Sequence, residues 1–132
     1  MNDDDLNELE LATASVVKQA ARDFAATLAE TPQFRAYEEA ADRLNHDAEA
    51  QRAIEAFETR QQSLQAMLML KAVSEADQAE LQRLKRAFSS LPAVVAYTQA
   101  QADLMTMCQT TADLLSQAIG LDYAAVCGPG CC

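Results

Sequence analysis

Apolar residues recur at intervals of three and four along nearly the whole chain, and this spacing is that of helices with one buried face. Residues that favour strands are scarce, because valine and isoleucine together number eight among 132 residues. Glycine, which weakens helices, occurs only three times. The sequence therefore predicts an all-α protein without a sheet.

Residues that begin and end helices divide the chain into about five segments, with breaks near residues 30, 46, 74 and 91. Thr31 can cap the second helix, and Pro32 fits its first turn. Asp47 can cap a third helix that we expect to run from Ala48 to about Val73.

The remaining boundaries follow the same chemistry. Ser74-Glu75-Ala76-Asp77 has the spacing of a capping box, with Asp in place of the usual Glu, and opens a fourth helix. Pro92 begins a fifth helix, and Gly120 ends it. The first helix carries one apolar stripe, which extends over about six turns: Leu6, Leu9, Val16, Val17, Ala20, Phe24 and Leu28.

A pattern in the second helix returns sixty residues later in the fifth. The first copy is Pro32-x-Phe34-x-Ala36-Tyr37-x-x-Ala40-x-x-x-Leu44, and the second is Pro92-x-Val94-x-Ala96-Tyr97-x-x-Ala100-x-x-x-Leu104. Either one helical unit is used twice, or alanine-rich helices have produced a chance match.

The apolar residues provide only a thin core, because 27 of the 66 hydrophobic residues are alanine. We therefore expect an elongated antiparallel helical hairpin or bundle that completes its burial by oligomerising, with itself or with a relative. The run Met67, Leu68, Met69 and Leu70 is apolar on every side of its helix. It is interpreted as part of the subunit interface, with core packing as the alternative.

Charge and hydropathy restrict the partners. The net charge is −10, and no Lys or Arg follows Arg86, so direct nucleic-acid binding is disfavoured. No apolar run is long enough to cross a membrane, and the first residues are acidic rather than basic. We expect a cytoplasmic protein without membrane insertion.

We also expect no enzyme activity, since the one histidine, His46, has neither a nucleophile nor a second ligand near it in sequence.

Three of the four cysteines, Cys127, Cys131 and Cys132, lie in the last six residues, a stretch too short and too rich in Gly and Pro to pack as a helix. We therefore divide the chain into a helical domain, 1–121, and a flexible cysteine-rich tail, 122–132. Accessible thiols in a reducing compartment are typical ligands of iron–sulfur clusters or of zinc.

The tail offers three thiols, whereas such sites usually need four ligands. The fourth would come from Cys108, from the tail of a second subunit, or from a partner. Cys108 itself has the spacing of a buried small hydrophobe. Alternative functions for the tail are delivery of a metal or cluster, a thiol redox cycle, or no function.

The same capping and packing residues resemble the YlbF/YmcA family of bacterial regulatory proteins. The similarity covers residues 6–121 and includes both Pro/Tyr units and the segment Lys71-Ala72-Val73-Ser74-Glu75-Ala76-Asp77. It implies an oligomeric, non-enzymatic adaptor. Such proteins act with relatives and a further partner on competence, development, biofilm formation and the specificity of a membrane-associated endoribonuclease. The resemblance also implies an iron–sulfur-bearing complex, although the Cys-Gly-Pro-Gly-Cys-Cys ending matches no pattern of the whole family.

Overall fold

The computed structural model describes residues 13–127, except for the side chains of Ala124 and Cys127, and contains no strand in this range. The all-α prediction is confirmed. The helices are α2 (Ala14–Ala29), α3 (Pro32–His46), α4 (Ala48–Ser63), α5 (Gln65–Met69), α6 (Glu75–Ser89), α7 (Pro92–Ile119) and α8 (Tyr123–Cys127).

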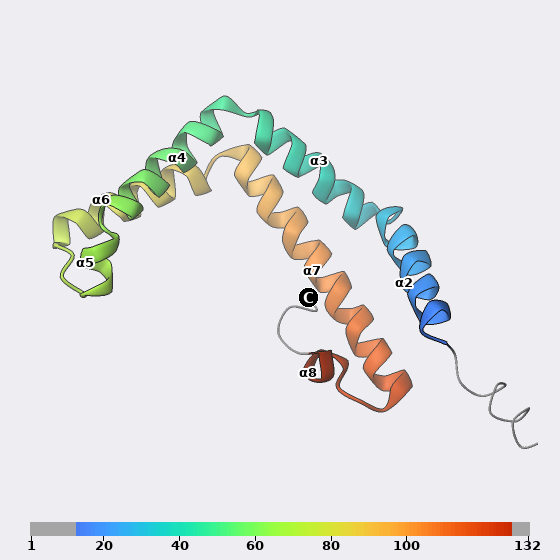
Figure 1. Cartoon of the computed structure of the whole chain (residues 1–132). Coiled ribbons are helices and arrows are strands. Elements are labelled where there is room, and N and C mark those ends of the chain that lie inside the picture. The colour runs from blue at the N-terminus through green and yellow to red at the C-terminus, as the bar shows by residue number, and fades with distance from the viewer. Residues whose placement is uncertain (1–12, 128–132) are drawn as a thin grey trace, which may run out of the picture.

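The helices form a bent, elongated molecule with two arms (Figure 1). In the first arm α4 runs antiparallel to α6, and α5 lies at the far end. The first half of α7 runs antiparallel to α3. Helix α2 continues beyond α3 and, with the second half of α7, makes the second arm. Helix α8 folds back against α7.

The predicted N-caps are confirmed by hydrogen bonds. Thr31 Oγ1 accepts from the backbone N–H of Phe34 at 3.2 Å, and Asp47 Oδ1 accepts from that of Ala50 at 2.9 Å. Gly120 ends α7 with a φ of 69°, a left-handed conformation that glycine adopts without strain. The side chains of Thr31 and Asp47 bind backbone N–H groups that a helix start leaves free, and so they fix where α3 and α4 begin.

The capping box at Ser74 forms only in part. Ser74 Oγ accepts from the N–H of Asp77 at 3.1 Å, as a cap should. The carboxylate of Asp77 does not return to the backbone of Ser74. It accepts from the Ser74 hydroxyl at 2.8 Å and from Arg60. The shorter Asp side chain therefore joins α6 to α4 instead of closing the box.

The third helix was predicted to run from Ala48 to about Val73, and its predicted end is wrong. Helix α4 stops at Ser63, Leu64 interrupts, and α5 ends at Met69. Leu64 is only 3% exposed, so the backbone turns there to bury it. Lys71 then takes a left-handed φ of 53°, which no helix interior allows.

Helix α8 (Tyr123–Cys127) is a second difference, because it lies inside the segment 122–132 that we expected to be a flexible tail. Two hydrogen bonds begin it. The backbone N–H of Tyr123 donates to Ser116 Oγ at 3.0 Å, and that of Ala125 donates to Asp122 Oδ1 at 3.2 Å. The first of these contacts also ties α8 to α7.

The core of the described residues consists of small side chains, and no large side chain in it is fully buried. Its centre lies where α3, α4, α6 and α7 meet. The residues buried there are Ala50, Ala93 and Val94, with Leu44, Ile54, Phe88 and Leu91 partly buried around them. Between α3 and α7, the rings of Tyr37 and Tyr97 lie 5.5 Å apart and their hydroxyls are hydrogen-bonded at 3.3 Å.

We predict that Asp47→Ala lowers the free energy of unfolding by about 1 kcal/mol, because it removes the cap of α4. Chemical denaturation followed by circular dichroism measures this change. The control is Glu39→Ala, at an exposed position within α3, which should change stability much less. Equal losses in the two variants would contradict the role of the cap.

We predict that Tyr97 ionises at a higher pH than an ordinary tyrosine. Its hydrogen bond with Tyr37, and secondarily its burial, raise the pKa of Tyr97 above the usual value. The folded protein thus keeps this proton where the unfolded chain has lost it. The stabilisation is present below about pH 10 and is lost as pH rises through the folded pKa.

Tyrosinate absorbance during an alkaline titration measures this pKa. In Tyr37→Phe the pKa of Tyr97 should fall toward that of an ordinary tyrosine, whereas Tyr123→Phe should leave it raised. An unchanged titration in Tyr37→Phe would show that the hydroxyl contact does not hold the proton.

Candidate protein-interaction surfaces

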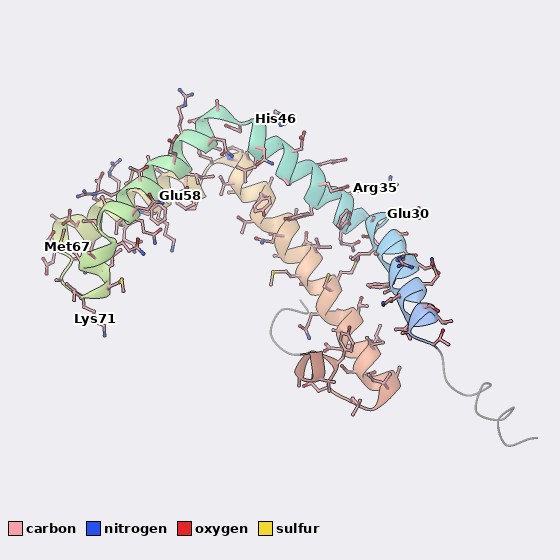
Figure 2. All side chains as sticks on the ribbon, viewed as in Figure 1. Glu30, Arg35, His46, Glu58, Met67 and Lys71 are labelled. Atoms are coloured by element: carbon pink, nitrogen blue, oxygen red, sulfur yellow. The ribbon has the colours of Figure 1, made fainter. Side chains whose placement is uncertain are left out.

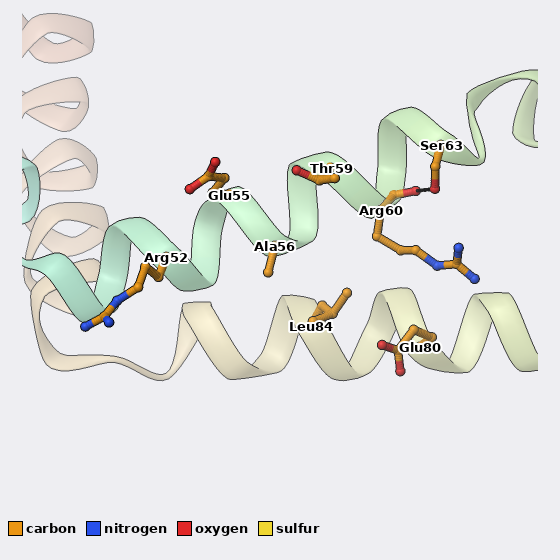
Figure 3. Close-up of a pocket in the computed structure, with 8 residues that line it drawn as sticks. All are labelled: Arg52, Glu55, Ala56, Thr59, Arg60, Ser63, Glu80 and Leu84. Atoms are coloured by element: carbon orange, nitrogen blue, oxygen red, sulfur yellow. Dashed lines mark hydrogen bonds between the residues drawn. The ribbon is translucent and has the colours of Figure 1, made fainter.

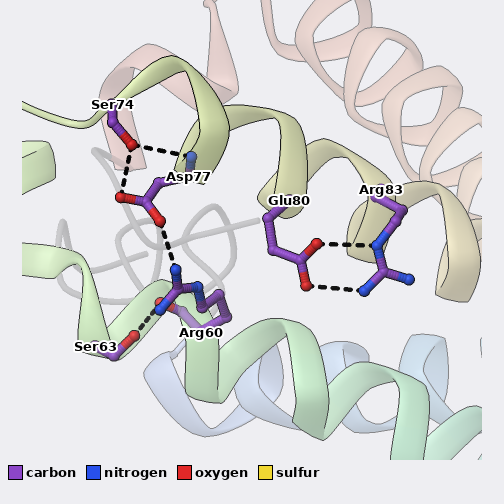
Figure 4. Close-up of polar contacts among 6 residues, drawn as sticks. All are labelled: Arg60, Ser63, Ser74, Asp77, Glu80 and Arg83. Atoms are coloured by element: carbon purple, nitrogen blue, oxygen red, sulfur yellow. Dashed lines mark hydrogen bonds and ion pairs between the residues drawn. The ribbon is translucent and has the colours of Figure 1, made fainter.

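A polar network fixes the end of the α4–α6 arm (Figure 4). Arg60 on α4 forms an ion pair with Asp77 in the first turn of α6, while the Ser63 hydroxyl donates to the carbonyl oxygen of Arg60 at 2.8 Å. Because Asp77 also binds Ser74, the turn between α5 and α6 is held to the end of α4. The network therefore positions α5 at the tip of the arm.

A shallow open groove runs between α4 and α6 (Figure 3). Its polar lining mixes both signs of charge. Glu80 is bound by Arg83 at 3.0 and 2.8 Å, and this contact lowers the pKa of Glu80 and raises that of Arg83. No histidine or cysteine lines the groove. The lining residues, which the sequence did not single out, are Arg52, Glu55, Ala56, Thr59, Arg60, Ser63, Glu80 and Leu84.

The predicted interface run lies at the tip of this arm, on α5 and just after it (Figure 2). All four side chains are exposed, at 43% for Met67, 37% for Leu68, 79% for Met69 and 78% for Leu70. The alternative of core packing therefore does not hold in the isolated chain. That these residues form an interface stays a prediction.

A second exposed apolar surface lies on the other arm. The apolar stripe predicted for the first helix lies partly on α2, and α2 has no buried residue. Its part before residue 13 lies outside the described residues. The second half of α7 also has no buried residue. The exposed large side chains of this arm are Val16, Val17, Phe24, Met105, Leu114, Leu115 and Ile119.

The cysteines are only partly placed. Cys108 is a free thiol on α7 and is exposed, so the expectation that it is a buried hydrophobe is wrong. It lies in the second half of α7. Cys127 is the last residue of α8, while Cys131 and Cys132 lie outside the described residues. Among the described residues, no three His, Cys, Asp or Glu side chains are grouped as a metal site.

His46 ends α3 in an exposed position. Its Nδ1 lies 2.8 Å from the carbonyl oxygen of Asp42 and 3.3 Å from the carboxylate of the same residue. The ring therefore interacts within its own helix and completes no catalytic pair in the described residues. Over residues 13–127 there is also no helix long and apolar enough to span a membrane.

Comparison with known proteins identifies the family of this chain. Residues 17–120 match the model of the family described as "Control of competence regulator ComK, YlbF/YmcA". No curated protein and no solved structure matches the chain. The match covers all helices from α2 to α7 apart from the first turn of α2, and thus both arms of the molecule. The chain belongs to the YlbF/YmcA family.

Proposed function

We propose that this protein is a non-enzymatic regulator that acts by binding other proteins. The observation that supports this most is the pairing of a regulatory family with two exposed apolar surfaces, at the α5 tip and along α2 and α7. Exposed apolar patches on a polar protein mark contact surfaces. In the described grooves no hydroxyl is hydrogen-bonded to a carboxylate or an imidazole, which favours contact over catalysis.

The α5 tip is a surface that we assign to contact with another protein chain. It projects at the end of an arm, far from α2, and its two methionines adapt to differently shaped partners. The partner would be a family relative or a protein linked to RNA processing. The acidic net charge argues against direct contact with RNA.

The regulatory role predicts that deleting the gene changes the abundance or the processed ends of a set of transcripts. RNA sequencing of the deletion strain measures this, and the wild-type gene should restore the pattern. Restoration by Met69→Asp should be weaker, because a charge replaces an exposed apolar contact residue. The matched control is Gln65→Asp, an exposed polar position in the same helix. Unchanged transcripts in the deletion strain would contradict the proposal.

We also propose that the C-terminal cysteines bind an iron–sulfur cluster, or else zinc, through Cys127 with Cys131 or Cys132. The choice rests on their thiol chemistry and on the spacing of Cys-Gly-Pro-Gly-Cys-Cys. Three thiols are one fewer than such a site usually takes. The exposed thiol of Cys108 is a candidate for the fourth, as is a cysteine from a second copy. Metal binding would then depend on assembly.

This proposal predicts that the triple variant Cys127→Ser, Cys131→Ser and Cys132→Ser loses its metal after anaerobic purification. Elemental analysis and the absorption spectrum measure the loss, and Cys108→Ser tests the fourth ligand separately. A brown protein indicates a cluster, and a colourless one with exchangeable zinc indicates a metal carrier. Wild type without metal in the presence of its natural partners would overturn the metal proposal and leave thiol redox chemistry or an inert tail.

A further inference from the structure

Helix α5 ends in a turn that glycine would normally form. The backbone N–H of Lys71 donates to the carbonyl oxygen of Leu68 at 3.2 Å, and that of Ala72 donates to the carbonyl oxygen of Met67 at 2.9 Å. These two bonds are those of a Schellman motif, in which the residue after the C-cap takes a left-handed conformation. That residue is Lys71, with a φ of 53°, and its Cβ makes this conformation less favourable than it is for glycine.

No contact within the described chain accounts for a lysine at this turn. The Lys71 side chain is exposed at the end of the first arm (Figure 2), and none of the ion pairs within residues 13–127 involves it. A residue held in an unfavourable backbone conformation often serves a function rather than the stability of the fold. The Lys71 ammonium is thus free to bind a partner, next in sequence to the exposed side chains of Met69 and Leu70.

A shallow groove lies near this turn, between α5 and the first two turns of α6. Leu68 on α5 and Leu81 on α6 add apolar surface to it. The small side chain of Ala79 allows a second helix to approach α6 closely. The groove therefore suits an amphipathic helix laid beside α6. Four of the lining residues share one face of α6, at intervals of three, one and three residues: Glu75, Gln78, Ala79 and Gln82.

Charge is distributed unevenly between this arm and the rest of the chain. Residues 48–90, which contain α4, α5 and α6, carry six of the ten basic residues and six of the twenty acidic ones, so their net charge is zero. The rest of the chain carries four basic and fourteen acidic residues, and thus the whole net charge of −10. An acidic partner is repelled by the rest of the chain and approaches the neutral arm most easily.

The charges at the tip itself are those of Lys71, Glu75 and the Arg60–Asp77 pair. The pair is already neutralised within the arm. Glu75 lies in the first turn of α6, where the helix dipole stabilises a carboxylate, so its presence is explained by the fold. The lysine has no such explanation. It is therefore the charge that the tip offers to a partner, and a carboxylate is the group that it would bind.

We propose that the α5 tip binds an amphipathic helix of a partner protein that carries an acidic residue beside its apolar stripe. The apolar stripe covers Met69, Leu70 and the groove along α6, while the carboxylate binds Lys71. The inference rests on the proposed function, because it names the chemistry of the partner that the regulator binds at this tip.

Two synthetic helical peptides with the same leucine stripe test this contact, one with glutamates beside the stripe and one with lysines in their place. The methyl NMR signals of Met67 and Met69 in the full chain report binding at the tip. The glutamate peptide should shift these signals and should bind Lys71→Gln about threefold more weakly, because an exposed ion pair is lost. Glu75→Gln should bind it more tightly, and Lys71→Arg should bind it as the wild type does. Absence of these shifts, or tighter binding of the lysine peptide at the tip, would overturn the inference.

The variant Lys71→Gly separates the contact from the turn. It should raise the Tm by about 2 °C, because glycine adopts the left-handed conformation without strain. It should nevertheless bind the glutamate peptide as weakly as Lys71→Gln does. The matched control is Lys85→Gln, which removes the same charge from an exposed position near the other end of α6 and should leave binding unchanged.

A Lys71→Gly variant that is no more stable than the wild type, or that binds the glutamate peptide equally well, would overturn the inference. So would a Lys85→Gln variant that loses as much affinity as Lys71→Gln, since the effect would then belong to the charge of the whole arm. These measurements use the purified protein alone. They are thus independent of the transcript experiment, which tests the regulatory role.

Discussion

The contact between α3 and the first half of α7 determines where the rest of the chain lies. Alanines at equivalent positions of the repeat, Ala40 and Ala100, are each 8% exposed, and their small side chains let the two helices approach closely. Tyr37 and Tyr97 fill the space between the helices and satisfy each other's hydroxyls. From this contact the chain leaves in two directions, so both arms depend on it.

The two arms show how one helical unit can be completed in different ways. At one end the chain itself supplies the cover, since it turns at Asp47, runs out along α4 and returns as α6. The Arg60–Asp77 pair holds this return in place. At the other end α7 continues straight past the position where α3 gives way to α4 in the equivalent unit. An uninterrupted α7 therefore leaves α2 without the neighbour that α6 has.

What the sequence predicted well is local. The caps at Thr31, Asp47 and Ser74 each bind a backbone N–H three residues away, so their chemistry can be inferred without knowledge of the fold. The end of the third helix could not be predicted in this way. It depends on the burial of Leu64 and on the conformation of Lys71, which packing against the rest of the arm decides.

Periodicity has a similar limit at the candidate surfaces. It identifies which side of a helix is apolar but not whether another helix covers that side. Cys108 and Phe24 both lie on correctly predicted stripes and are nevertheless exposed. The run from Met67 to Leu70 was easier to interpret, because a segment that is apolar on all sides cannot be covered by one neighbouring helix. The family resemblance added the regulatory role, which no single side chain encodes.

Burial and charge together suggest how such a protein selects its partners. Burial of a large apolar side chain contributes about 1.5–3 kcal/mol of free energy. Exposed residues such as Phe24 and Met69 do not make this contribution in the folded chain, so they can make it when a partner covers them. Apolar surfaces alone discriminate poorly, and charges beside them provide the selection. Because no basic residue follows Arg86, α7 favours basic helices and repels phosphates.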